Sequence, residues 1–123
     1  MRVVKLDAPV SGGEIEGKII NQDIFEAARF LPKSFADLIV LDPPYNLLKN
    51  FHGHVFEGRD KDEYARYFRM ILDAVLPALK ACGTIYVCSD WKTSMHIAPV
   101  LEDRLCVRNR ITWEREKGRG AKA

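Results

Sequence analysis

Residues 42–45, Asp-Pro-Pro-Tyr, follow an apolar run at 38–41 that has the composition of a buried strand. Two consecutive prolines fix φ and remove two N–H donors, which makes a stiff corner. This corner places the Asp42 carboxylate beside the Pro43 carbonyl, and two adjacent acceptors suit an NH2 group. Tyr45 adds a ring that can stack on a planar partner. The pattern predicts a site for an amino group on a planar ring, with a rigid turn as the structural alternative.

The strand that ends at this corner is expected to lie in a parallel sheet. Its apolar run is continuous rather than alternating, which indicates that both of its faces are covered. In open α/β sheets, ligands bind outside the carboxyl ends of the strands, where residues 42–45 fall. The predicted position of the corner therefore supports the chemical interpretation.

The remaining pattern predicts an α/β chain in which strands alternate with helices. Gly83 is expected to cap the longest helix, and Pro77 to kink it. The expected elements are a leader and a turn before residue 17, strands at 18–25, 34–42, 84–90 and 105–116, helices at 24–32, 61–83 and 91–104, and a loop at 46–60.

The motif DPPYN after a strand resembles the catalytic motif of the S-adenosylmethionine-dependent DNA amino-methyltransferases, which methylate adenine N6 or cytosine N4. The segments at 17–46, 76–91 and 108–120 also resemble the flanking elements of that family. The resemblance implies a Rossmann-like methyltransferase sheet, mostly parallel, with helices on both faces and incomplete in this chain. It further implies double-stranded DNA as the partner and S-adenosylmethionine as the cofactor.

The resemblance makes Asp42, Pro43, Pro44 and Tyr45 the catalytic residues. Hydrogen bonds from the target amine to Asp42 and to the Pro43 carbonyl would favour the pyramidal nitrogen of the transition state. The base must be flipped out of the duplex, and Tyr45 would stack on it. By the resemblance, an aspartate as the first residue of the motif favours adenine N6 as the methylated group. Methylation of cytosine N4, RNA or a protein amide is an alternative. Another alternative is a catalytically silent fragment that binds DNA or a partner chain.

Further candidate residues have structural alternatives. Asp23 would lie near the cofactor's adenine or cap a helix. Asn46 would contact the substrate or fix the turn. Trp113 would line the base pocket or pack in the core. Lys49 lies in the long loop with His52, His54 and Arg59, where these side chains could meet phosphate, and the two histidines lack the further ligands of a metal site.

One family feature is missing, namely a glycine-rich Phe-x-Gly-x-Gly turn after a strand. We therefore expect residues 1–16 to be a leader and 17–123 to be the catalytic part of a methyltransferase domain, ending where a target-recognition region would start. A second copy or a complementing chain would then be a partner, and the activity of the chain alone is open. The sequence is equally compatible with a role in a restriction-modification system, in a phage or in genome regulation.

The composition is that of a globular protein, with 47% hydrophobic and 29% charged residues and a net charge of +2. Basic residues outnumber acidic ones in residues 104–123, either as a solvated tail or as the entry to a DNA-binding region. Cys82, Cys88 and Cys106 have no CxxC spacing and are expected to be reduced. No apolar run has the roughly 20 residues that span a bilayer. Together with this, the resemblance implies a cytoplasmic protein encoded by a bacterium, archaeon or phage.

Overall fold

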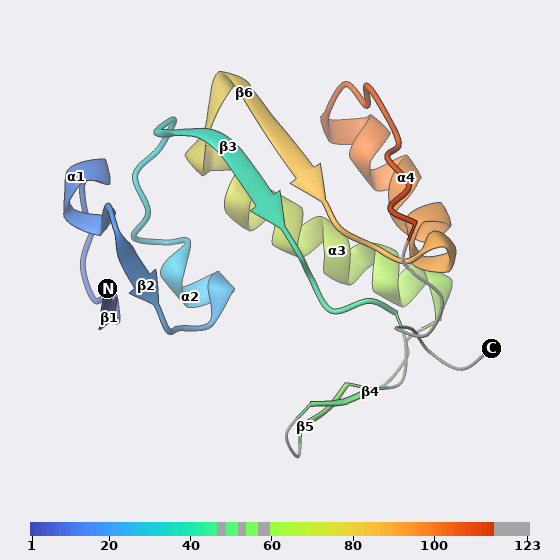
Figure 1. Cartoon of the computed structure of the whole chain (residues 1–123), viewed down its shortest axis with the longest axis horizontal. Helices are drawn as coiled ribbons and strands as arrows, with labels where there is room; N and C mark the ends of the chain where they lie inside the picture. The colour runs from blue at the N-terminus through green and yellow to red at the C-terminus, as the bar shows by residue number, and fades with distance from the viewer. Residues whose placement is uncertain (47–48, 52–53, 57–59, 115–123) are drawn as a thin grey trace.

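The computed structural model describes residues 1–46, 49–51, 54–56 and 60–114, with backbone only at 49–51 and 54–56. Helices and strands alternate along most of this chain, as expected for an α/β protein (Figure 1). The elements are β1 (Arg2–Val4), α1 (Gly12–Ile15), β2 (Lys18–Ile20), α2 (Ile24–Ala27), β3 (Ala36–Leu41), β4 (Lys49–Phe51), β5 (His54–Phe56), α3 (Lys61–Val75), a 3₁₀ turn (Leu76–Ala78), β6 (Leu79–Val87) and α4 (Trp91–Arg104).

The described strands pair two by two. β1 pairs with β2 and β3 pairs with β6, both in parallel, whereas β4 and β5 form an antiparallel hairpin that projects away from the other elements (Figure 1). The segment predicted as a leader thus contributes β1 and α1, and the predicted long loop contains the hairpin. These pairings could not be predicted locally, because a three-residue strand is defined mainly by its hydrogen-bonding neighbour.

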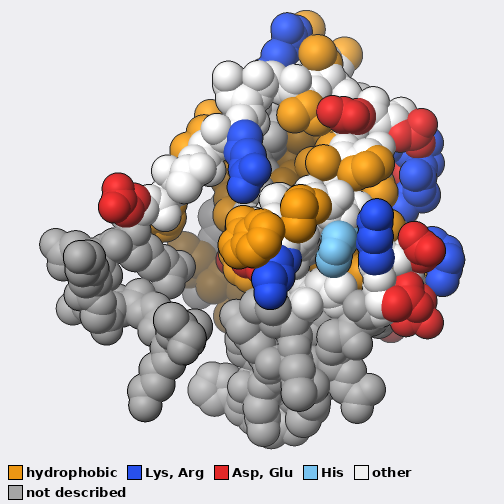
Figure 2. All heavy atoms as spheres, turned by 90° about the vertical axis from the view of Figure 1, so that its right-hand side faces the viewer, with side chains coloured by type: hydrophobic (Ala, Val, Ile, Leu, Met, Phe, Trp, Pro, Cys, Tyr) orange, Lys and Arg blue, Asp and Glu red, His pale blue; other side chains and the backbone are white. Residues whose placement is uncertain are grey.

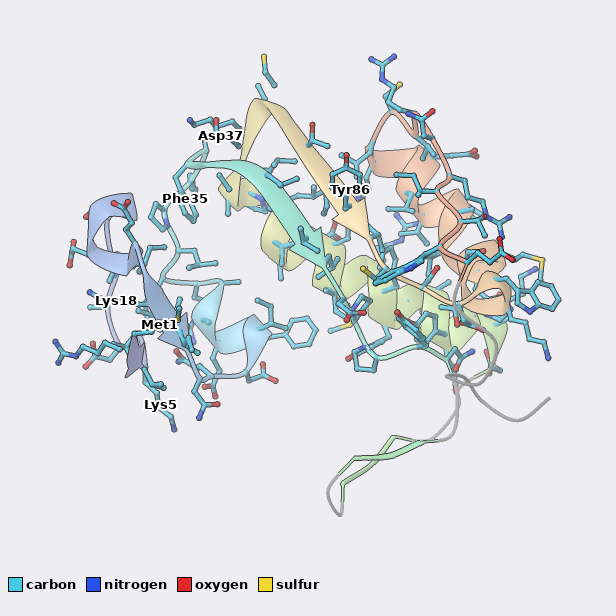
Figure 3. The ribbon with its side chains drawn as sticks, in the orientation of Figure 1. Met1, Lys5, Lys18, Phe35, Asp37 and Tyr86 are labelled. Carbon is cyan, nitrogen blue, oxygen red and sulfur yellow. The ribbon has the colours of Figure 1, made fainter. Side chains whose placement is uncertain are left out.

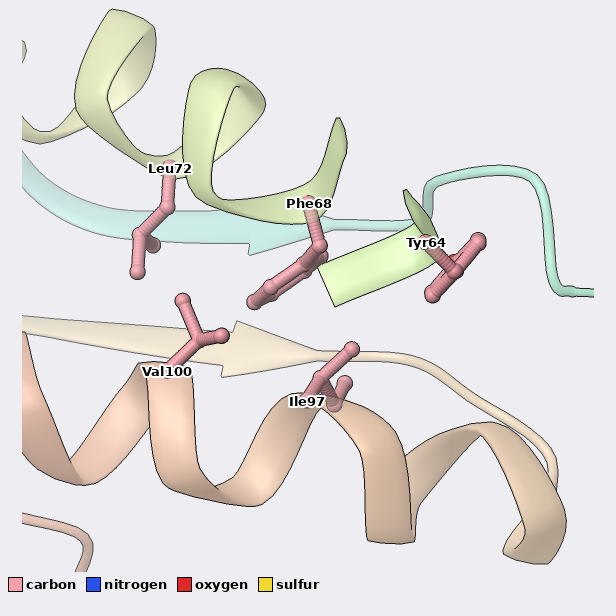
Figure 4. Close-up of a cluster of buried hydrophobic side chains, with 5 residues drawn as sticks. All are labelled: Tyr64, Phe68, Leu72, Ile97 and Val100. Atoms are coloured by element: carbon pink, nitrogen blue, oxygen red, sulfur yellow. The ribbon is translucent and has the colours of Figure 1, made fainter. Parts of the chain in front are cut away.

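Helices α3 and α4 pack together against the β3–β6 pair. Every third or fourth residue of each helix points to the shared core, as an amphipathic helix requires (Figure 4). The buried members are Tyr64, Phe68 and Leu72 from α3 and Ile97 and Val100 from α4. Leu41, Ile85 and Val87 of the two strands pack against this cluster from the sheet.

The opposite face of the β3–β6 pair is uncovered in the described part of the chain. Leu38, Val40 and Tyr86 are exposed there, and Figure 3 shows Tyr86 on β6. The prediction that both faces are covered is therefore wrong for the described residues. A continuous apolar run indicates two faces that avoid water, but it does not show that the same chain supplies both covers.

The helix predicted at 61–83 ends earlier than expected. Pro77 has no N–H to continue the helix, and its ring would clash with the carbonyl of residue 73. Accordingly α3 stops at Val75, a 3₁₀ turn contains Pro77, and β6 begins at Leu79. Gly83 is thus inside a strand and does not cap a helix. A Cβ atom at Gly83 would lie 2.5 Å from Leu79 Cδ1 and 3.0 Å from the Lys80 carbonyl oxygen, so any other residue there would require the Leu79 side chain to move.

Two further predictions need correction. The helix predicted at 24–32 covers only Ile24–Ala27, since the chain then turns and the Phe30 carbonyl accepts a hydrogen bond from the Val10 N–H. The strand predicted at 105–116 is absent from residues 105–114, where Val107, Ile111 and Trp113 are exposed. Within the described residues no neighbouring strand pairs with this segment. Helix α4, in contrast, confirms the prediction for 91–104 at both ends.

Two exposed ion pairs join α3 to α4. Arg69 lies 2.7 Å from Asp103, and Arg104 lies 3.0 Å from Asp73. The hydrogen bond and charge of Arg69 lower the pKa of Asp103, and the hydrogen bond and charge of Asp73 raise the pKa of Arg104. None of the helices formed by the described residues is both long and apolar enough for a bilayer crossing.

Candidate active site at the end of strand β3

The Asp42–Asn46 corner starts directly where β3 ends. Strand β6 runs parallel to β3 and ends beside it, and the Cys88 N–H donates a 2.8 Å hydrogen bond to the Leu41 carbonyl. The corner therefore lies at the carboxyl ends of two neighbouring parallel strands. This is the edge at which ligands bind in α/β sheets, as the sequence predicted.

The residues of the corner differ in exposure. Asp42 and Pro44 are exposed, Pro43 is buried, and Tyr45 and Asn46 are half-buried. Within the described residues, neither the Asp42 carboxylate nor the Pro43 carbonyl accepts a hydrogen bond. The two acceptors predicted for an amino group are consecutive along the chain and are not used by other described groups.

A buried tyrosine holds one side of the corner. The Tyr64 hydroxyl, from the first turns of α3, donates a 2.5 Å hydrogen bond to the Pro44 carbonyl, and Tyr64 is fully buried. The helix begins at Asp60, whose carboxylate caps it by accepting a hydrogen bond from the Glu63 N–H at 2.8 Å.

A buried threonine holds the other side. The Asn46 N–H donates a 3.1 Å hydrogen bond to Thr93 Oγ1, and Thr93 is 1% exposed. Thr93 lies in the first turn of α4, where its own N–H donates to the capping carboxylate of Asp90. The first turns of both core helices therefore meet at the corner.

Sequence analysis missed Tyr64 and Thr93 as parts of this site. Tyr64 falls on the apolar face of the helix predicted at 61–83, and Thr93 is a polar residue within the helix predicted at 91–104. Their hydroxyl groups, each near the start of a helix, were the available signal. Such a signal does not identify a partner 20 or 47 residues away.

Among the additional candidates, Asp23 has a clear structural role. Its carboxylate accepts a 2.9 Å hydrogen bond from the Phe25 N–H and caps α2, which confirms the capping alternative. Asp23 therefore lies on the β2–α2 connection and not at the end of the β3–β6 pair.

Trp113 is 83% exposed, which excludes core packing; a contact with the base stays a prediction. The Lys49 side chain, the His54 side chain, His52 and Arg59 lie outside the described residues, so their predicted contacts with phosphate also stay predictions. No cluster of three or more His, Cys, Asp or Glu side chains able to hold a metal occurs in the described ranges.

Exposed apolar and basic side chains lie at the start of α4, beside the corner. Trp91 and Met95 are 61% and 53% exposed, and Lys92 Nζ lies 5.8 Å from the centre of the Trp91 ring. Figure 2 shows hydrophobic and basic side chains next to one another on this end of the molecule. A surface hollow of about 190 Å³ lies elsewhere, between β1 and α1, and none of its lining residues belongs to the corner.

The sequence pattern of the DNA methylase family matches residues 36–123, which include β3, the corner, α3, β6 and α4. The chain belongs to the N6/N4 DNA methylase family. The Asp42–Asn46 corner therefore lies within the matched region.

Three curated relatives are similar to this chain over most of its length. Type II methyltransferase M.HpaI of Haemophilus parainfluenzae is 30% identical over 86% of the chain, and Type II methyltransferase M.BamHI of Bacillus amyloliquefaciens is 28% identical over 83%. DNA adenine methyltransferase YhdJ of Escherichia coli K12 is 27% identical over 85%. The chain spans 34%, 24% and 35% of these relatives, respectively.

Proposed function

We propose that this chain carries the base-binding and amine-binding part of a DNA adenine N6-methyltransferase. The observation that supports the proposal is the Asp42–Tyr45 corner, which pairs an exposed carboxylate with a neighbouring carbonyl at the carboxyl end of a parallel strand. The half-buried ring of Tyr45 follows directly. We further propose that residues 17–123 form part of a larger Rossmann-like sheet and work on DNA in the cytoplasm.

The proposed chemistry uses the two acceptors together. The exocyclic amine of adenine is a poor nucleophile because its lone pair is delocalised into the ring. Hydrogen bonds from its two hydrogens to the Asp42 carboxylate and the Pro43 carbonyl favour a pyramidal nitrogen with a localised lone pair, so they stabilise the transition state more than the ground state. The methylated nitrogen then releases a proton to Asp42 or to water.

The base reaches these acceptors only outside the duplex. A flipped adenine presents its amine to Asp42 while its ring stacks on Tyr45. Exposed Lys92 and Trp91, at the start of α4 beside the corner, support DNA as the macromolecular partner, because cations and exposed rings contact phosphates and unstacked bases.

S-adenosylmethionine, the donor implied by the family, supplies an electrophilic methyl group when bound. The sequence has no Phe-x-Gly-x-Gly turn, and one oxygen of the Asp23 carboxylate caps α2, so a contact between Asp23 and the donor stays a prediction. The proposal therefore assigns to Asp42, Pro43 and Tyr45 the base side of the reaction and no contact with the donor.

A second candidate has a specific observation in its favour. The chain spans 24–35% of its relatives, and one apolar face of the β3–β6 pair is uncovered. The chain would then be one part of a split or longer enzyme, active only with the polypeptide that completes it. Cytosine N4 is the competing target within the family.

The test is methyl transfer from labelled S-adenosylmethionine to unmethylated duplex DNA, followed by nucleoside analysis. The chain is assayed alone and together with a polypeptide that supplies the remaining length of its relatives. Label in N6-methyladenine supports the proposal, label in N4-methylcytosine corrects the target, and no label in either form contradicts it.

Two aspartates of the same segment provide the matched variants. Asp42→Ala is expected to lower kcat about a hundredfold or more, as loss of a transition-state partner does. Asp37→Ala removes an exposed carboxylate whose partner among the described residues is Lys80, at 2.8 Å on the surface, and is expected to leave kcat unchanged. Equal activity of the two variants would exclude the proposed role of Asp42.

A further inference from the structure

Two hydrogen bonds that hold the corner lie on either side of Tyr45. The Pro44 carbonyl belongs to the peptide plane that precedes the Tyr45 Cα atom, and the Asn46 N–H belongs to the plane that follows it. The Tyr64 hydroxyl binds the first plane and Thr93 Oγ1 binds the second. Because φ and ψ of Tyr45 are the rotations between these planes and the Cα atom, holding both planes fixes the direction of its side chain.

The chain before Tyr45 is restrained as well. The Leu41 carbonyl accepts the hydrogen bond from the Cys88 N–H at the end of the sheet, and the proline rings fix φ at 43 and 44. The proline nitrogens cannot donate, so few backbone hydrogen bonds can hold the corner. Hydroxyl groups from two separate helices supply them instead.

Burial makes both hydroxyl groups rigid supports. Tyr64 and Thr93 are 0% and 1% exposed, and Tyr64 packs in the core formed with Phe68 and Ile97 (Figure 4). A fully buried ring in a close-packed core has little rotational freedom. The position of the Tyr64 hydroxyl is therefore set by the packing of α3 against α4.

We propose that Tyr64 and Thr93 are positioning residues, which hold Tyr45 in the orientation that stacks on the flipped base and keep Asp42 in register with it. This inference rests on the proposed function. It adds that the packing of two helices sets the base-binding geometry, through one hydroxyl group from each helix.

The first test examines the anchoring and does not depend on activity. Thr93→Val removes Oγ1 at nearly constant volume, so the Asn46 amide is expected to exchange its hydrogen about tenfold faster in NMR measurements. Thr93→Ser keeps the hydroxyl and restores slow exchange. Tyr64→Phe is expected to shift the ¹³C resonance of the Pro44 carbonyl. Ser94→Ala is the matched control, since its hydroxyl donates to the Trp91 carbonyl of the same helix and, within the described part of the chain, not to the corner.

The second test uses the form of the protein that transfers the methyl group. Tyr64→Phe and Thr93→Val are each expected to lower kcat about fivefold to tenfold, the value of one hydrogen bond, with KM for the donor unchanged. Thr93→Ser restores kcat, and Ser94→Ala keeps it. A purely structural role would instead lower thermal stability without separating kcat from KM.

The outcomes distinguish this inference from the function on which it rests. Unchanged amide exchange and an unchanged carbonyl resonance would show that the hydroxyl groups do not hold the corner. Faster exchange with wild-type kcat would show that they hold it without positioning Tyr45. Absence of methyl transfer by the wild-type protein would overturn the proposed function, and the exchange data would still decide whether the corner is anchored.

Discussion

Val40 on β3 and Tyr86 on β6 are paired in the parallel sheet, and both side chains are exposed on the same face. Val40 is 65% exposed and Tyr86 50%, and Leu38 on the same face is 53% exposed. The strands of parallel sheets are normally buried on both faces, and a contiguous exposed apolar patch promotes association. The 123-residue chain therefore presents a surface that favours contact with another polypeptide.

We predict that the isolated chain self-associates through this face. Replacing Val40 and Tyr86 together by lysine should shift its sedimentation toward the monomer, because charges resist burial against an apolar surface. Met70→Lys, at an exposed position of α3, is the control and should leave association unchanged. A wild-type chain that sediments as a monodisperse monomer at micromolar concentration would contradict the prediction.

The contact between α3 and α4 is predicted to carry much of the stability. Phe68 is fully buried between the two helices, so Phe68→Ala should lower the free energy of unfolding by about 3–5 kcal/mol. Ile97→Val in the facing helix should lower it by about 0.5–1.5 kcal/mol, which gives a graded comparison if the alanine variant does not fold. Met70→Ala, exposed on α3, should change it by less than about 0.5 kcal/mol. Urea unfolding followed by circular dichroism measures all three, and a Phe68→Ala loss as small as that of Met70→Ala would refute the prediction.

Local signals in the sequence predicted the position of the Asp42 corner and the bounds of α4 better than they predicted the surrounding strands. The corner depends on adjacent residues, namely two prolines after an apolar run, and the helix predicted at 91–104 is a continuous local segment. Gly83 was misassigned because a glycine after a helical pattern can cap the helix or lie in the next strand, and Pro77 had already ended the helix.

Features that depend on distant partners could not be predicted in the same way. The hydrogen bond between Asn46 and Thr93 joins residues 47 positions apart, and no periodic pattern in the sequence predicts such a contact. The prediction of a strand at 105–116 is wrong for residues 105–114 for a related reason. Apolar residues recur along this segment, but no described strand pairs with it. Pairing and burial are properties of the assembled chain, so residue types alone do not determine them.

The ion pair between Arg69 and Asp103 predicts a pH dependence of stability. The hydrogen bond and charge of Arg69 depress the pKa of Asp103 in the folded state. The pair therefore stabilises the fold at pH above the unfolded value of about 3.9, and this contribution is lost as the pH falls through the lower folded pKa. Since both side chains are partly exposed, the effect should be small and should decrease with added salt.

Thermal unfolding of Asp103→Asn across pH 2–7 checks this expectation about the ion pair. The variant should be less stable than the wild type near neutral pH and equal to it at the acidic end. Glu102→Gln makes the same change of charge in the same helical turn, so it corrects for the general electrostatic effect. A constant difference between Asp103→Asn and the wild type at every pH would contradict the linkage.

Tyr45 provides the most direct test of base binding, because its ring and its backbone contribute separately. Stacking of a base on an aromatic ring contributes roughly 1–3 kcal/mol, so Tyr45→Ala should lower kcat/KM for DNA about 5-fold to 150-fold. Tyr45→Phe keeps the ring and should retain most of the activity.

Because Tyr64 and Thr93 bind the backbone on either side of Tyr45, neither substitution removes the anchors of the corner. Slow amide exchange at Asn46 in both variants would therefore show that the corner is intact, and any loss of activity could be assigned to the ring. If Tyr45→Ala kept wild-type kcat/KM with the corner intact, the flipped base would have to stack on another residue.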